Sequence, residues 1–230
     1  MTTCGRDDWL RAGKWAAFYA GSFAPHLGAD VVGTIEQLPW RSNGVSTPLE
    51  EFITSGRLPA GARALELGCG TGENLVRLAS TCKDVIGIDI VDAAVDATRE
   101  ALAAANVSAK VAVADVLALP PEMRHAFDFV FDCQTFHCVR KVDEDAAADA
   151  VCSLLAPGGR LLLLTGNADE VEERGPERLR REDLDRAFAT RGLVCEECEP
   201  FYFDMTDAYR RQTQFAKPPL GWRSVWRRPC

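Results

Sequence analysis

Short apolar runs alternate with amphipathic segments along most of this chain from residue 62 onward. Five β-rich runs are candidate strands: 62–67, 84–90, 110–115, 127–132 and 160–165. The segments between them carry apolar residues at helical spacing, at 73–80, after Asp92 and at 143–155. Strands that alternate with helices in this way predict a parallel, doubly wound sheet with helices on both faces.

The pattern changes after residue 165. A charged stretch at 166–181 is expected to be a loop, and a helix is expected at 182–190. Two further strands, near 193–203 and 221–227, follow without a recognisable helix between them. Because parallel neighbours need a crossover connection, we expect one of these two to run antiparallel at the edge. The predicted fold class is therefore α/β, with a mostly parallel sheet of seven strands.

The first 46 residues are rich in aromatic side chains and only weakly periodic. Positions 15, 18, 19 and 23 fit one helical face, which predicts a short amphipathic helix. A helix start follows at Thr47-Pro48-Leu49-Glu50, with Thr47 as the capping residue, and Gly56 is expected to end that helix. We expect a lid segment at 1–46 and one core domain at 47–230.

Composition excludes several classes of protein. With 230 residues, 47% hydrophobic and 26% charged, the chain is typical of one globular domain with additions. Its 26 basic and 34 acidic residues give a net charge of −8, which argues against nucleic acid as a partner. Nine scattered cysteines and no apolar leader or membrane-length run predict a reduced, cytoplasmic protein without membrane contact. The oligomeric state stays open, with a monomer favoured.

The segment LELGCGTGENL carries the most informative residues of the chain. Gly68, Gly70 and Gly72 follow a predicted strand and open a predicted helix, as in nucleotide-binding loops. A dinucleotide site needs its third glycine one position later, where this chain has Glu73, a carboxylate that would repel a pyrophosphate. A phosphate-binding Gly-Lys-Ser/Thr sequence is also missing. The loop favours a ligand with positive charge.

Two aspartates at later strand ends define the rest of that ligand. Asp89 ends the second predicted strand, where it can accept hydrogen bonds from two ribose hydroxyls. Asp115 ends the third, where it can accept from an adenine amino group. A ligand with adenine, ribose, a cationic centre and no phosphate is S-adenosylmethionine (SAM).

ALELGCGTGENLVRLA and VIGIDI closely resemble the first two motifs of the class I SAM-dependent methyltransferases, and the resemblance covers about residues 45–230. It implies a Rossmann-like fold whose last strand is antiparallel. It also implies that Gly68, Cys69 and Gly70 line the methionine part, Asp89 and Ile90 the ribose, and Asp115 and Val116 the adenine. The expected cofactor set is completed by Glu66, Gly72 and Cys133.

Three further stretches are similar to thiopurine methyltransferase-like and tellurite-resistance-like enzymes. They are Leu38-Pro39-Trp40 with Thr47-Pro48, FDFVFDCQTFHCV at 127–139, and PPLGWRSVWRR at 218–228. Arg41 stands where that group often has aspartate, so no role of that aspartate is carried over. The similarity implies methylation of a sulfur, selenium or related soft atom in a small molecule.

The acceptor chemistry is consistent with that group. A thiolate is already nucleophilic at neutral pH, so alignment with the sulfonium is the main requirement. The candidate catalytic residues are Asp132 and His137, and the candidate acceptor-binding residues are Trp15, Tyr19, Trp40 and Phe136. Phe136 and His137 are expected to face outward to the acceptor, although His137 is equally compatible with packing. No metal is expected, because Cys133, His137 and Cys138 lack the spacing of a closed zinc site.

The leading hypothesis is therefore a SAM-dependent S-methyltransferase that acts on a small thiol or thioether sulfur. Halides, thiocyanate and metalloids are alternative acceptors, since the same desolvated pocket suits soft anions. A protein methylase or a non-catalytic SAM-binding module is the alternative of another class.

Overall fold

The computed structural model describes residues 12–20, 38–172, 177–213 and 217–230. The helices are α1 (Ala12–Tyr19), α2 (Thr47–Thr54), α3 (Glu73–Ala79), α4 (Asp92–Ala104), α5 (Phe136–Val139), α6 (Glu144–Leu154), α7 (Arg181–Phe188) and α8 (Asp207–Thr213). The strands are β1 (Arg63–Leu67), β2 (Asp84–Asp89), β3 (Lys110–Val113), β4 (Phe127–Cys133), β5 (Leu155–Asn167), β6 (Arg178–Leu179), β7 (Val194–Tyr202) and β8 (Leu220–Arg227). Short 3-10 turns lie at Val116–Ala118, Pro121–Met123 and Ala189–Arg191.

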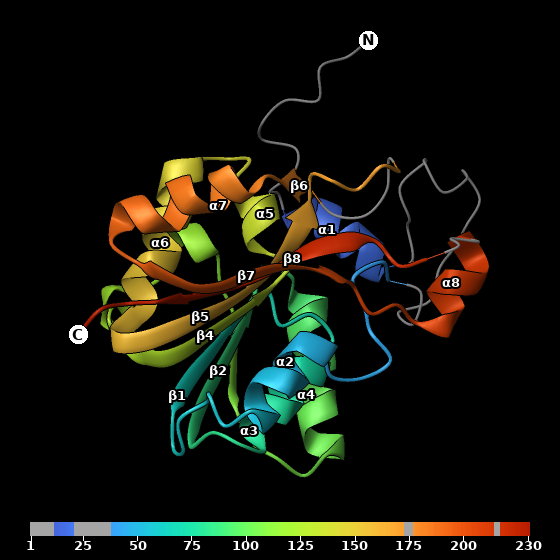
Figure 1. The fold of residues 1–230 in the computed structure, drawn as a ribbon. Helices are drawn as coiled ribbons and strands as arrows, with labels where there is room; N and C mark the ends of the chain where they lie inside the picture. The colour runs from blue at the N-terminus through green and yellow to red at the C-terminus, as the bar shows by residue number, and fades with distance from the viewer. Residues whose placement is uncertain (1–11, 21–37, 173–176, 214–216) are drawn as a thin grey trace.

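Seven strands form one continuous sheet in the order β3-β2-β1-β4-β5-β8-β7, which confirms the predicted fold class (Figure 1). The first five are parallel to their neighbours, and β8 is antiparallel to both β5 and β7. The antiparallel strand is therefore inside the sheet, and the expectation that it lies at the edge is wrong. The edge on that side is β7.

Helices cover both faces of the sheet, and each face has its own apolar core (Figure 1). Alternation along the strands divides the side chains: Val130 lies in one core, while Phe129 and Phe131 lie in the other. The first core is closed by α5, α6 and α7, including Phe188. The second is closed mainly by α2 and α3, with Phe52 stacked on Phe129 at a centroid distance of 5.0 Å. All of these side chains are fully buried.

The carboxyl ends of β2, β1 and β4 lie level with one another. Leu67 at the end of β1 pairs with Ile88 on one side and Asp132 on the other. The chain leaves β1 toward β2 but reaches β4 only after β3, so the strand order reverses between β1 and β4. Ligands of open α/β sheets bind at such a point, and the glycine loop that follows Leu67 lies there.

Three local predictions differ from the structure. The charged stretch 166–181 contains β6, which extends the pairing of β5 at Gly166 and Asn167. Between β7 and β8 the chain forms α8, which an Arg- and Gln-containing sequence without an apolar stripe did not indicate. Thr47 does not cap α2; the N-cap is Ser46, and the Thr47 side chain bonds Asp204 instead. Gly56 does follow α2 with a φ of 75°, as expected of a helix end.

Among the helices of the described residues, none has the length and apolar character needed to cross a bilayer.

Candidate functional site

The glycine loop lies in a backbone conformation that favours glycine at three positions. Gly68, Gly70 and Gly72 have φ angles of 66°, 56° and 89°. A Cβ at Gly68 would stand 2.0 Å from the Thr135 hydroxyl oxygen, and that hydroxyl donates to the Leu67 carbonyl at 3.0 Å. The end of β1 therefore packs closely against the turn that follows β4.

Asp89 holds the glycine loop in place. One carboxylate oxygen accepts from the backbone N–H of Gly70 and the other from that of Val91, each at 3.0 Å. Burial is the largest influence on this group and raises the pKa of Asp89, while the hydrogen bonds act in the opposite direction. Each oxygen keeps a further lone pair, so the predicted bonds from ribose hydroxyls are compatible with this geometry, as is the position of Ile90 immediately after β2.

Asp115 lies two residues beyond β3 and is exposed. Its carboxylate accepts from the Leu117 N–H at 2.9 Å and so caps the turn that starts at Val116. Asp115 therefore has a structural role as a capping residue, in addition to its predicted contact with adenine. The contact of Asp115 and Val116 with adenine stays a prediction.

The end of β4 is a second tightly hydrogen-bonded turn. Asp132 is completely buried, and its oxygens accept from the backbone N–H groups of Thr135 and Phe136 at 3.0–3.1 Å. Burial raises the pKa of Asp132 to about 7, against the effect of these hydrogen bonds. Asp132 thus shapes the turn beside the glycine loop, and a direct catalytic role for it stays a prediction.

Burial is the main influence on the pKa values of three other predicted cofactor residues. Glu66 is 2% exposed, its Oε2 has no hydrogen-bond partner, and burial raises the pKa of its carboxyl group well above the usual range. The pKa values of the Cys69 and Cys133 thiols are also raised, mainly by burial and then by nearby carboxylates. Both cysteines are therefore protonated at neutral pH and are poor nucleophiles.

The expectation that Phe136 and His137 face outward is wrong. Each is 1% exposed. The Phe136 ring packs on Phe188 of α7 at a centroid distance of 4.9 Å, within the core beneath α6 and α7. The helix α5 that carries them is a single turn, and periodicity over four residues cannot show which side of it is buried.

His137 is neutral in the folded protein. Burial, with Lys141 and Arg140 nearby, lowers its pKa to about 3, and its Nδ1 has no hydrogen-bond partner. The His137 imidazole is therefore buried and carries no charge at neutral pH. The interpretation of His137 as a packing residue is therefore favoured over an acid–base role.

This burial predicts a pH-dependent stability. Between about pH 6.5 and 3 the unfolded chain protonates His137 and the folded chain does not, so acidification favours unfolding by up to about 1.4 kcal/mol per pH unit. His137→Asn should remove this component from urea titrations recorded across that range. His125→Asn, at an exposed histidine, is the matched substitution control. Asp132 contributes a slope of opposite sign to all three proteins, which cancels in the comparison. Equal slopes in wild type and His137→Asn would contradict the assignment.

An aromatic cluster stands over the glycine loop. Trp15, Phe18 and Tyr19 of α1 contact the Trp40 ring at centroid distances of 5.5, 5.2 and 6.1 Å. The Tyr19 hydroxyl lies 3.5 Å from the position of a Cβ at Gly70. Burial raises the pKa of Tyr19, and Asp89 adds to the rise, so the hydroxyl stays protonated. The predicted acceptor-binding aromatics are thus brought together, with Tyr19 nearer the cofactor loop. Two further parts of the predicted lid, residues 1–11 and residues 21–37 with Phe23, lie outside the described residues.

The segment after Trp40 is fastened to the first turn of α3. Arg41 pairs with Glu73 at 2.7 Å, and the Ser46 N–H donates to the Asn74 side-chain oxygen at 2.8 Å. Arg41, which stands where the thiopurine methyltransferase-like group often has aspartate, is therefore the partner of Glu73 at the end of the glycine loop.

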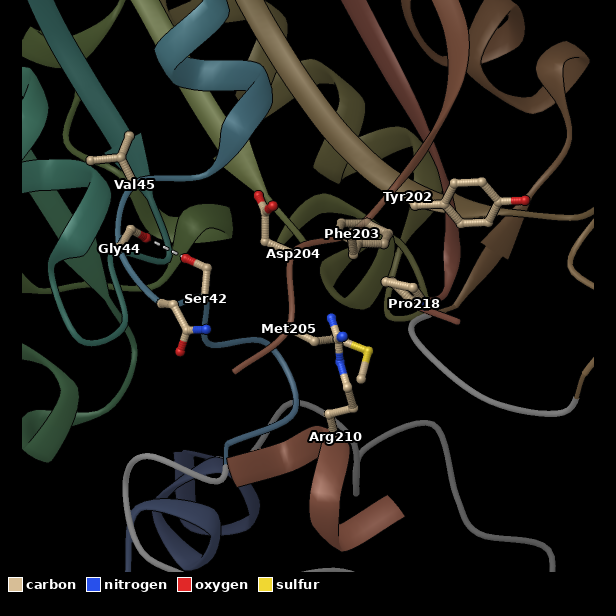
Figure 2. A pocket seen from close by; sticks show the side chains of 10 residues that line it. Ser42, Gly44, Val45, Tyr202, Phe203, Asp204, Met205, Arg210 and Pro218 are labelled. Carbon is tan, nitrogen blue, oxygen red and sulfur yellow. Dashed lines mark hydrogen bonds between the residues drawn. The ribbon is translucent and has the colours of Figure 1, made fainter. Parts of the chain in front are cut away.

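A cavity of about 430 Å³ opens beside this segment and was not predicted from the sequence (Figure 2). It is lined by Ser42, Asn43, Gly44, Val45, Tyr202, Phe203, Asp204, Met205, Arg210 and Pro218. The two walls are joined by Asp204, which accepts from the Thr47 N–H at 2.7 Å and the Thr47 hydroxyl at 2.9 Å. These residues are 157 positions apart in sequence, so no local pattern links them.

Within the described parts of the chain, no group of three or more His, Cys, Asp or Glu side chains is placed to hold a metal ion.

Comparison with known proteins finds similarity over the central region of the chain. Residues 64–159 match a family model described as a methyltransferase domain. The chain is 30% identical over 132 residues to a probable thiol methyltransferase 2 of Arabidopsis thaliana, covering 57% of this chain and 58% of the relative. It is 31% identical over 127 residues to thiocyanate methyltransferase 1 of Brassica oleracea, covering 55% of each.

A third relative has a different acceptor atom. The ubiquinone biosynthesis O-methyltransferase of Xanthomonas axonopodis pv. citri (strain 306) is 33% identical over 138 residues, covering 56% of each chain. The chain spans little more than half the length of these curated relatives. A solved structure described by the conversion of a disulfide bond into a thioacetal group during echinomycin biosynthesis superposes with a TM-score of 0.74 at 21% identity. It covers 95% of this chain and 91% of the other, which establishes a shared fold.

Proposed function

We propose that the protein transfers the methyl group of SAM to a sulfur atom of a small molecule, since residues 64–159 match a family model of methyltransferase domains and the sheet has the topology predicted for the class I methyltransferases. The glycine loop and Asp89 hold the cofactor at the reversal of strand order. Glu66 and the turn at Asp132–Cys133 border its methionine part. The Tyr19–Trp40 cluster covers it, and aromatic faces attract a sulfonium.

The observation that carries the assignment to sulfur is the state of the two candidate bases. His137 is buried and neutral, and the Asp132 carboxylate is completely buried while it accepts from backbone N–H groups. An alcohol or phenol acceptor needs help to lose its proton, whereas a thiol is partly ionised at neutral pH. The names of the thiol and thiocyanate methyltransferase relatives support the same atom.

The direct test is a panel of acceptors supplied with SAM labelled in its methyl group. Small thiols and thioethers should become labelled, while a phenol, an amine and a peptide mixture should not. Thiocyanate, iodide and arsenite are included because soft anions and metalloids are the alternative acceptors. Product from the phenol alone would favour the chemistry of the O-methyltransferase relative and contradict the assignment. Product from peptides alone would show a protein methylase.

A further inference from the structure

The cavity beside residues 42–45 lies next to the end of β4. Two of its lining residues, Val45 and Phe203, belong to the same apolar core as Cys69 of the glycine loop and Cys133 at the end of β4. Burial is the main cause of the raised pKa of Cys133, and the carboxylate of Asp204 is close enough to add to it. The cavity therefore lies on the same face of the sheet as the glycine loop and close to the end of β4, where we expect the cofactor to present its methyl group.

Arg210 brings a positive charge to this cavity. Its side chain extends from α8 beside Met205, toward the wall formed by Phe203 and Asp204 (Figure 2). Among the described residues, none forms an ion pair with Arg210, in contrast to Arg160 of β5, Arg181 of α7 and the arginines of β8. The carboxylate of Asp204 bonds to Thr47 and not to Arg210.

The rest of the lining is mixed in character, and its accessible surface is more polar than apolar. Val45, Phe203, Met205 and Pro218 provide the apolar part, while the Ser42 hydroxyl donates to the Gly44 carbonyl (Figure 2). A volume of about 430 Å³ lies in the range of small-ligand pockets and far exceeds the size of a halide or thiocyanate ion. The guanidinium presents paired N–H donors that match a carboxylate.

We propose that Arg210 binds the carboxylate of the methyl acceptor, and that the acceptor is a small thiol whose sulfur and carboxylate are separated by a short apolar linker. The proposal rests on the proposed function, since it names the substrate class of that site. Arg210 is then a specificity-determining residue. It binds a part of the acceptor away from the reacting sulfur.

The experiment compares Arg210→Gln with Arg211→Gln, a variant of the adjacent exposed arginine that does not line the cavity. The acceptors are 3-mercaptopropionate and the neutral thiol 2-mercaptoethanol, with thiocyanate as a bare anion. Arg210→Gln should lower kcat/KM for 3-mercaptopropionate by about 10- to 100-fold, the usual range for a lost charged hydrogen bond. The value for 2-mercaptoethanol should stay within about twofold, as should all values for Arg211→Gln.

The outcomes separate this proposal from the one before it. Equal losses on both thiols in Arg210→Gln would assign the residue a structural role, and no preference of the wild type for the carboxylate would also overturn the proposal. Methylation of 2-mercaptoethanol would leave the proposed function standing in either case. A preference for thiocyanate that depends on Arg210 would overturn the carboxylate-bearing class. If no thiol is methylated, calorimetry of 3-mercaptopropionate with protein loaded with S-adenosylhomocysteine decides: binding lost only in Arg210→Gln supports the site, and unchanged or absent binding overturns it.

Discussion

Gly68→Ala is expected to abolish SAM binding, with a loss of at least 100-fold in affinity by calorimetry. The new Cβ would stand 2.0 Å from the Thr135 hydroxyl oxygen, so the glycine loop and the turn after β4 cannot both keep their positions. The left-handed φ of 66° adds a backbone cost of about 1–2 kcal/mol. The loop would therefore shift at the point where the cofactor has to approach the backbone.

Two variants separate the clash from the backbone cost. Gly192 has a similar φ of 81° with nothing within 4 Å of its Cβ position, so Gly192→Ala should cost about 1 kcal/mol of stability and leave SAM affinity unchanged. Adding Thr135→Ala to Gly68→Ala removes the clashing hydroxyl and should recover part of the lost stability. Tight SAM binding by Gly68→Ala, or an equal loss in Gly192→Ala, would show that the close approach is unimportant.

Asp89→Asn is expected to weaken SAM and S-adenosylhomocysteine about 10- to 100-fold. The amide retains one acceptor oxygen where the carboxylate uses two, for Gly70 and Val91, and lacks the charge that strengthens bonds from ribose hydroxyls. Asp92→Asn is the control, because Asp92 is exposed in the first turn of α4. Calorimetry should show normal affinity in the control, and unchanged affinity in Asp89→Asn would remove the ribose assignment.

The sequence predicted the parts of the fold that depend on local pattern. The runs that became β1, β2, β4 and β5 are short and mostly apolar, because both faces of these strands are covered by helices. The glycine spacing located the loop correctly, since three left-handed φ angles in five residues leave a visible signal. The thiopurine-like or tellurite-resistance-like subgroup stays a prediction, as do the lid boundary at 46, the monomer and the cytoplasmic location.

The features that escaped the sequence depend on distant contacts or on very short elements. The two residues of β6 have no periodicity, and α5 is too short to show its buried side, which is why Phe136 was misplaced. Arg210 had no signal of its own. Its significance depends on the return of the chain after β7 to the segment at 42–45, and the bond from Thr47 to Asp204 is what brings the two together.

The position of β8 inside the sheet has a consequence for how the sheet assembles while the chain is being synthesised. Residues 220–227 leave the ribosome after every other strand of the sheet, yet they fill the position between β5 and β7. Until they emerge, β7 has no neighbour and one side of β5 is open, and such unpaired edges invite association with other chains. A nascent chain stalled before residue 220 would thus be a client for chaperones, and the sheet is completed only after translation has passed β8.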